Sequence, residues 1–259
     1  MRRAITHLKK SDPVMASIIA RVGPFRLDRR PATFEAMVRA IVFQQLAGAA
    51  ARTIYQRLQN ACEQALGGQD TERSLYGGFM ITPESVLALT EDQMRACGLS
   101  RQKLSYIRDL AHKTIARDVD FAILPNMSDD EVIEHLTRVK GVGVWSAQMF
   151  LIFALGRLDV MPTADLGINM AICKAYGKRK IPKPKQILKF SEKWKPYRSL
   201  ACWYLWRSAD KPAKKTQPPR TQRNTKAKKA RASFSSVSSV AKFFLAIPVL
   251  LFRSAYIRG

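Results

Sequence analysis

Cysteine is scarce in this 259-residue chain, and the cysteines that do occur lie far apart. Their spacings are 35, 76 and 29 residues, for Cys62, Cys97, Cys173 and Cys202. The sequence contains no C-x-x-C pair and no histidine placed to complete a zinc site. We therefore expect reduced structural thiols rather than disulfides or a zinc centre.

Long hydrophobic runs are also lacking. The first residues, MRRAITHLKKSDPV, contain no apolar run of the length that a secretory signal needs. The run at 243–252 contains Pro248 and is about half as long as a membrane span. These absences predict an intracellular, reducing location and no membrane partner: the nucleus in a eukaryote, or the cytoplasm and nucleoid in a bacterium.

Acidic residues are few, since 44 Lys and Arg face only 20 Asp and Glu, and the formal net charge is +24. Half of that excess lies in residues 211–259, which carry twelve basic and no acidic residues, so +12 remains on residues 1–210. Such a charge predicts a polyanionic partner. Residues 211–259 are basic and then apolar low-complexity sequence, which predicts a disordered tail. Its KAKKAR motif fits a nuclear localisation signal or a phosphate-seeking segment, and both remain open.

Strict apolar and polar alternation is nearly absent, whereas helical periodicity runs from the start to about residue 208. The predicted class is therefore all-α. Capping residues, glycines and prolines set the ends of the expected helices. These helices lie near residues 34–42, 47–66, 82–89, 91–97, 100–117, 128–140, 144–155, 165–177 and 185–208, the last interrupted by Pro196.

A short Gly-Val-Gly turn separates two of these helices. Gly141 and Gly143 let the main chain approach a ligand closely, and Val142 lies between them. Backbone N–H groups of such a turn, together with the start of the second helix, can bind a phosphate without reading base sequence. A helix corner with glycines placed only for packing would look the same in isolation.

The surroundings of this turn resemble a known family. The segments LTRVKGVGVWSAQMFLIFALGRLDVMPTADLGI, FEAMVRAIVFQQLAGAAARTI, GLSRQKLSYIRDLA and WKPYRSLACWYLW, over roughly residues 30–208, resemble the helix-hairpin-helix (HhH-GPD) DNA glycosylase superfamily in its 3-methyladenine DNA glycosylase II branch. The resemblance implies a two-lobed helical body over residues 1–210. Its lobe A would span about 31–117, and its lobe B about 1–30 plus 118–210, with the helix-hairpin-helix at 131–155.

The resemblance assigns the catalytic carboxylate to Asp165, which follows Gly143 by 22 residues. Breaking an N-glycosidic bond builds positive charge on the sugar, and a fixed carboxylate stabilises that charge and can orient water. The alternative is that Asp165 only caps a helix. Many relatives have Asp-Asp where this chain has Ala164-Asp165, so Asp165 is the only candidate carboxylate in the motif.

Bifunctional relatives carry a lysine two residues after the second hairpin glycine, where this chain has Trp145. The resemblance therefore implies no lyase step by that route. It also assigns Trp145, Met149 and Trp206 to the pocket for the extruded base, where indole faces favour a cationic base. Taken singly, a tryptophan is more often a core residue, and Met149 fits either role.

Two adjacent amides, Gln44 and Gln45, interrupt the apolar stripe of one helix and predict a surface or a site there. In similar relatives such a pair enters the minor groove and fills the gap left by the flipped nucleotide. Leu46 is the other candidate for this role. A hydrogen-bonding role at the helix end is the alternative.

The resemblance further implies a monovalent cation, Na⁺ or K⁺, bound by the backbone carbonyls of Thr137, Val139 and Val142. It implies no required cofactor, and the scattered cysteines exclude the iron–sulfur cluster of some relatives. The predicted function is monofunctional excision of alkylated purines from double-stranded DNA by a monomer. A glycosylase for uracil, deaminated or mismatched bases, or a non-catalytic DNA-binding module, remain alternatives.

Overall fold

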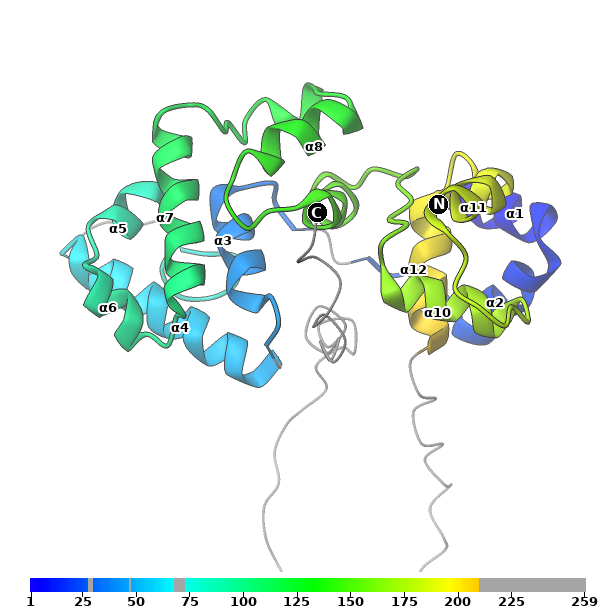
Figure 1. Cartoon of the computed structure of the whole chain (residues 1–259), viewed down its shortest axis with the longest axis horizontal. Helices are drawn as coiled ribbons and strands as arrows, with labels where there is room; N and C mark the ends of the chain where they lie inside the picture. The colour runs from blue at the N-terminus through cyan, green and yellow to red at the C-terminus, as the bar shows by residue number, and fades with distance from the viewer. Residues whose placement is uncertain (28–29, 47, 68–72, 210–259) are drawn as a thin grey trace, which may run out of the picture.

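The computed structural model describes residues 1–27, 30–46, 48–67 and 73–209. The predicted tail at 211–259 lies outside these residues. Helices are the regular elements of the described residues (Figure 1), and the one extended pairing among these residues is an isolated bridge between Arg73 and Phe79. The all-α prediction is confirmed. The helices are α1 (Arg2–Ser11), α2 (Pro13–Val22), α3 (Phe34–Phe43), α4 (Gly48–Ala65), α5 (Pro83–Leu87), α6 (Glu91–Ala96), α7 (Arg101–Ile115), η1 (Leu124–Asn126), α8 (Asp129–Thr137), α9 (Val144–Phe150), η2 (Leu151–Leu155), α10 (Leu166–Ala175), α11 (Pro184–Ser191), η3 (Glu192–Trp194) and α12 (Arg198–Ala209).

Hydroxyl side chains start several of these helices where the sequence predicts. Thr82, Thr90 and Ser128 each accept a hydrogen bond from the backbone N–H three residues later, and the side chain at that position bonds back, which completes a capping box. Ser100 caps α7 in the same way through the Lys103 N–H. The predicted helix at 144–155 is continuous, but its second half is the π-helical turn η2.

Two groups of helices pack around separate central helices (Figure 1). In one group α3 and α5 pack on α7, and in the other α2 and α10 pack on α12. α12 is buried on every side from Ser199 to Trp206, which explains its lack of an amphipathic pattern. In Figure 1, α8 lies beside the group that contains α7. The exact lobe boundaries stay a prediction.

A buried carboxylate connects the N-terminal helices to residues 176–194 of the described chain. Asp12 caps α2 by accepting hydrogen bonds from the backbone N–H groups of Val14 and Met15. Its other oxygen accepts from the Tyr176 hydroxyl at 2.6 Å and from Trp194 Nε1 at 2.9 Å, and it pairs with Lys193 Nζ at 2.9 Å. These contacts fix α1 and α2 against the segment that follows α10.

The described cysteines are all free thiols, and three of the four are buried. This agrees with the prediction of structural thiols. No helix within the described ranges combines the length and the apolar character that crossing a membrane requires.

Candidate active site

Asp165 is both the N-cap residue of α10 and a buried carboxylate. Its Oδ1 accepts a hydrogen bond from the Ile168 N–H at 2.8 Å, so it is the N-cap of the helix. Only 2% of the residue is exposed. The helix N-terminus favours the negative charge that burial opposes. The capping role considered from the sequence is therefore confirmed, and the question is what else the carboxylate does.

Two indole N–H groups converge on this carboxylate from helices distant in sequence. Trp145 Nε1 of α9 donates to Asp165 Oδ2 at 2.9 Å, and Trp206 Nε1 of α12 donates to Oδ1 at 3.0 Å. Oδ1 thus accepts from two donors, whereas Oδ2 accepts from Trp145, which is only half-buried. A carboxylate oxygen can accept more than one hydrogen bond. Oδ2 is therefore the oxygen with capacity left to face a substrate.

The arrangement differs in one respect from the stacking role expected for both indoles. The ring of Trp206 already stacks on Phe153, with centroids 5.6 Å apart and planes 27° apart. Its N–H edge points to Asp165, so Trp206 positions the carboxylate. Met149 is buried on α9, one turn after Trp145.

Phe153 belongs to the site, although sequence reasoning did not single it out. It lies in η2, the π-helical turn that continues α9, and its carbonyl accepts the Arg30 N–H at 3.1 Å. π-Helical turns are rare and often occur at functional sites. No sequence signal distinguishes Phe153, because every residue around it is also apolar.

The neighbours of Asp165 leave little free space around it. A Cβ at Gly167 would lie 3.2 Å from Asp165 Oδ1, so glycine gives the carboxylate its room. Burial and the nearby Asp165 charge raise the pKa of the Cys202 thiol well above its usual value. Cys202 is therefore a neutral thiol and not a nucleophile.

The hairpin between α8 and α9 has the geometry that the Gly-Val-Gly motif predicts. Gly141 has φ +76°, and a Cβ there would lie 2.1 Å from the Tyr106 ring. The Val142 N–H donates to the Val139 carbonyl within the turn at 3.1 Å. Gly143 then starts α9 with no side-chain cap, which leaves backbone N–H groups at the helix start for a ligand.

The structure connects the glutamine pair to this hairpin. Gln44 Nε2 donates to the Gly141 carbonyl at 3.1 Å and ends α3, as the helix-end alternative expected. Gln45 is exposed with φ +56°, and Leu46 is half-buried against the core. The predicted insertion of these residues into DNA stays a prediction.

The backbone carbonyls assigned to a monovalent cation lie at the end of α8 and in the hairpin. That of Val139 accepts the Val142 N–H and keeps a second lone pair for a cation. Those of Thr137 and Val142 flank it in sequence. Among the described residues no cluster of His, Cys, Asp or Glu could bind a metal ion.

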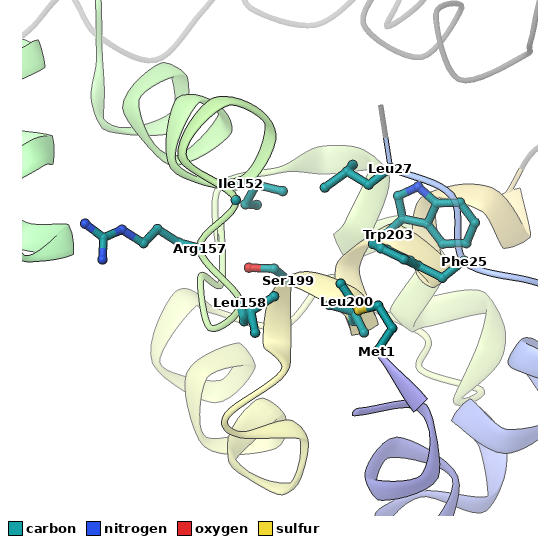
Figure 2. Close-up of a pocket in the computed structure, with 10 residues that line it drawn as sticks. Met1, Phe25, Leu27, Ile152, Arg157, Leu158, Ser199, Leu200 and Trp203 are labelled. Atoms are coloured by element: carbon teal, nitrogen blue, oxygen red, sulfur yellow. The ribbon is translucent and has the colours of Figure 1, made fainter. Parts of the chain in front are cut away.

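Figure 2 shows a hollow elsewhere, between α12, the residues after α2 and the end of η2. Its lining is mostly apolar and includes Phe25, Ile152, Leu158 and Trp203. At about 10 Å³ it has room for no more than one water molecule. It is not a base pocket, and Asp165 does not line it.

Comparison with known families matches residues 38–196 to the family described as "HhH-GPD superfamily base excision DNA repair protein". These residues contain the hairpin, Trp145 and Asp165. The chain belongs to the HhH-GPD superfamily. Its predicted fold, two groups of helices with a helix-hairpin-helix, is the fold of solved members of this superfamily.

Two of the similar HhH-GPD proteins are similar over nearly their whole length. DNA-3-methyladenine glycosylase 1 of Schizosaccharomyces pombe is 32% identical over 233 residues, which cover 86% of this chain and 94% of that protein. The alkylbase DNA glycosidase-like protein mag2 of the same yeast is 30% identical over 79% of this chain and 92% of its own length.

Solved structures agree with this relationship. The Schizosaccharomyces pombe 3-methyladenine DNA glycosylase in complex with abasic DNA has a TM-score of 0.65 and 34% identity, covering 79% of this chain and 95% of that one. DNA-3-methyladenine glycosidase of Bacillus halodurans has a TM-score of 0.67 and 32% identity, covering 80% and 89%.

Proposed function

We propose that this HhH-GPD protein is a monofunctional DNA N-glycosylase that removes alkylated purines of the 3-methyladenine type in base excision repair. The observation that carries the proposal is the carboxylate of Asp165, fixed by two indole N–H groups and one backbone N–H, 22 residues after the hairpin glycine. The similar proteins named above are glycosylases of this kind by name.

A carboxylate fixed in this way suits the chemistry of glycosidic cleavage. As the bond to the base breaks, positive charge develops on the sugar, and Asp165 Oδ2 stabilises it without having to reorganise. The same oxygen orients the water that completes the hydrolysis. An alkylated purine such as 3-methyladenine is already cationic and leaves readily, so no second acid is required at the base.

The residue composition of the site favours hydrolysis over lyase chemistry. Forming a Schiff base with the sugar needs an amine nucleophile, and Trp145 occupies the position of the lysine in bifunctional relatives. We assign Trp145 and Met149 to the base pocket, since Trp145 is half-buried beside the carboxylate. Opening of this pocket would accompany base flipping, because Asp165 is buried and a substrate must reach it.

The partner is DNA, as in the yeast relative whose structure contains abasic DNA. The hairpin at Gly141–Gly143 would contact a phosphate, and Gln44, Gln45 and Leu46 would occupy the minor groove beside the flipped nucleotide. A net charge of +24 supports a steeply salt-dependent affinity.

The test is free-base analysis after incubation with duplexes that carry an alkylated purine, uracil or a mismatch. We expect release from the alkylated duplex, and Asp165→Asn should reduce it by at least about 100-fold, because an amide keeps the cap but not the charge. Asp92→Asn, an exposed residue of α6, is the matched control and should excise normally.

Other outcomes separate the alternatives. Release of uracil or of a mismatched base in place of the alkylated purine would assign a different lesion. Binding to the alkylated duplex with no base released would leave a non-catalytic DNA-binding module. Full activity of Asp165→Asn would contradict the mechanism.

We also propose a structural Na⁺ or K⁺ at the carbonyls of Thr137, Val139 and Val142. Its support is the hairpin turn, in which the Val139 carbonyl keeps a free lone pair. Replacing K⁺ by a tetraalkylammonium ion at constant ionic strength should weaken duplex binding, since the larger ion cannot enter the turn. Unchanged affinity would contradict this proposal.

A further inference from the structure

One face of α7 contacts both segments that the proposed function assigns to DNA. The residues of this face are Lys103, Tyr106, Asp109 and Lys113. Spacings of three, three and four residues keep them on one side of the helix. At a rise of about 1.5 Å per residue, the face extends over roughly 15 Å.

Lys103 holds the segment at the end of α3. Its ammonium donates to the carbonyls of Val42 and Gln44, both at 2.6 Å. Carbonyls at a helix C-terminus lack intrahelical partners and favour a cation. Burial opposes this charge and lowers the pKa of Lys103 to about 8. The α3 end is therefore fixed by a partly buried cation.

The other half of the face holds the hairpin. Asp109 Oδ2 accepts the Lys140 N–H at 2.8 Å and pairs with Lys113 Nζ at 2.8 Å. Lys113 Nζ also donates to the Arg138 carbonyl. Burial opposes the charge of Asp109, but the hydrogen bonds from Lys113 and Lys140 prevail and lower its pKa.

Tyr106 lies between these two sets of contacts, and its ring fills the space above Gly141. The Gln44 amide closes the arrangement by donating to the Gly141 carbonyl across 97 residues of sequence. Next to it, Gln45 has φ +56°, which is unfavourable for a residue with a side chain. Such strain persists only where the surroundings fix the backbone, and it is common at ligand-binding segments.

We propose that this face of α7 is a spacer that fixes the turn at 44–46 relative to the hairpin at 138–143. The inference rests on the proposed function. Gap filling and phosphate binding act on the same stretch of duplex, so they must occur at one separation. A single rigid helix that contacts both sets this separation before DNA binds, which spares the cost of ordering it in the complex. Lys103 is thus a positioning residue, not a catalytic one.

The first test uses Lys103→Met, which keeps the aliphatic stem and removes the donor. We expect at least a 10-fold slower single-turnover release of base from an alkylated duplex. We also expect a smaller fluorescence increase from 2-aminopurine placed beside the lesion. Affinity for undamaged duplex should change less than 3-fold, because the hairpin contacts remain.

Two further variants separate positioning from charge and from stability. Lys103→Arg should retain excision within about 3-fold, because a guanidinium also donates to two carbonyls. Arg101→Met removes an exposed charge from the same helix and should excise at the rate of the unmodified protein. Excision by Lys103→Met at that same rate would overturn the inference. If the unmodified protein releases no base at all, the proposed function has failed instead.

The decisive test combines the two ends of the spacer. Asp109→Ala releases the hairpin and should also slow excision at least 10-fold. If the two variants act by changing the separation of the 44–46 turn from the hairpin, the double variant, Lys103→Met with Asp109→Ala, should excise no more than about 3-fold slower than the slower single variant. The two changes should nevertheless add in the free energy of unfolding, because the two residues lie about 9 Å apart along α7. A double variant whose excision rate falls by the product of the two single reductions would overturn the proposal that α7 is a spacer.

Discussion

At the scale of single residues, the hydrogen bonds to Asp165 give two tryptophans a role that differs from the one the sequence predicts. From the sequence, Trp145 and Trp206 are stacking surfaces for a base. In the structure both turn their N–H edges to the carboxylate, and one face of Trp206 is covered by Phe153. Hydrogen bonds to a charged group are worth about 1.5–3 kcal/mol each. These hydrogen bonds are therefore strong enough to fix the position of the carboxylate.

The indole donors can be tested singly. Trp206→Phe keeps a ring against Phe153 but removes the N–H to Asp165 Oδ1, and we expect excision to fall about 10- to 100-fold. Trp203→Phe is the matched control on the same helix, since no hydrogen-bond partner is described for its Nε1. Single-turnover assays measure both. Equal activity of the two variants would show that the Trp206 donor does not position the acid.

At the scale of elements, capping and periodicity predict most helices from residue 34 onward, because both signals are local, but they do not single out α1 or α2. Ser128 with Glu131 and Ser100 at α7 are examples in which a cap alone sets the start. The π-helical turn at 151–155 could not be predicted, because an all-apolar segment has no period to interpret. The α7 face was missed as well, since its contacts are with segments 25 to 61 residues away in sequence.

The hairpin permits a matched pair of glycine variants. Gly141→Ala should lower duplex affinity and the free energy of unfolding by about 1–3 kcal/mol, because the added methyl group meets the Tyr106 ring and the φ of +76° is strained. Gly143→Ala has open space, so it should cost less, under about 1 kcal/mol for a poorer helix start. Urea denaturation and a binding titration measure both effects. Equal unfolding free energies for the two variants would contradict the close packing of the hairpin on α7.

At the scale of the whole molecule, Asp12 connects the N-terminal helices to residues 176–194. Burial opposes its charge, but hydrogen bonds from Tyr176, Lys193 and Trp194 prevail and lower the pKa of Asp12 below its usual value. The stabilisation is therefore fully present above the unfolded-state pKa of 3.8 and is lost as pH falls through the lower, folded-state pKa. No local pattern predicts this contact, because its partners lie more than 160 residues away.

Asp12→Asn tests this connection. At pH 7 the variant should unfold more easily by about 3 kcal/mol, since the hydrogen bonds from Tyr176 and Trp194 lose their charged acceptor. The difference from the unmodified protein should shrink steadily as the pH is lowered below 3.8. Urea denaturation over this range measures it. A difference independent of pH would show that the carboxylate is not charged in the folded protein.

The charge of the whole chain predicts how it binds undamaged DNA. For a protein of net charge +24 that neutralises about six phosphates, affinity should fall by about 1,000-fold between about 50 and 200 mM salt. Asp165→Asn should follow the same line in a titration by fluorescence anisotropy, because the buried carboxylate does not face phosphate. A salt-independent affinity would contradict phosphate binding. The predicted monomer, lobe boundaries and cellular location remain predictions at this scale.

The side chain to which we assign the chemistry also caps α10, through its hydrogen bond from the Ile168 N–H. A mutation at position 165 that removes activity can therefore also lower the stability of the fold. An apolar replacement removes the helix start together with the acid, whereas Asn, Ser or Thr keeps the start. Inactive descendants of such a chain should hold those three residues at this position, and a survey of natural variants that found mostly Ala, Val or Leu there would speak against the double role.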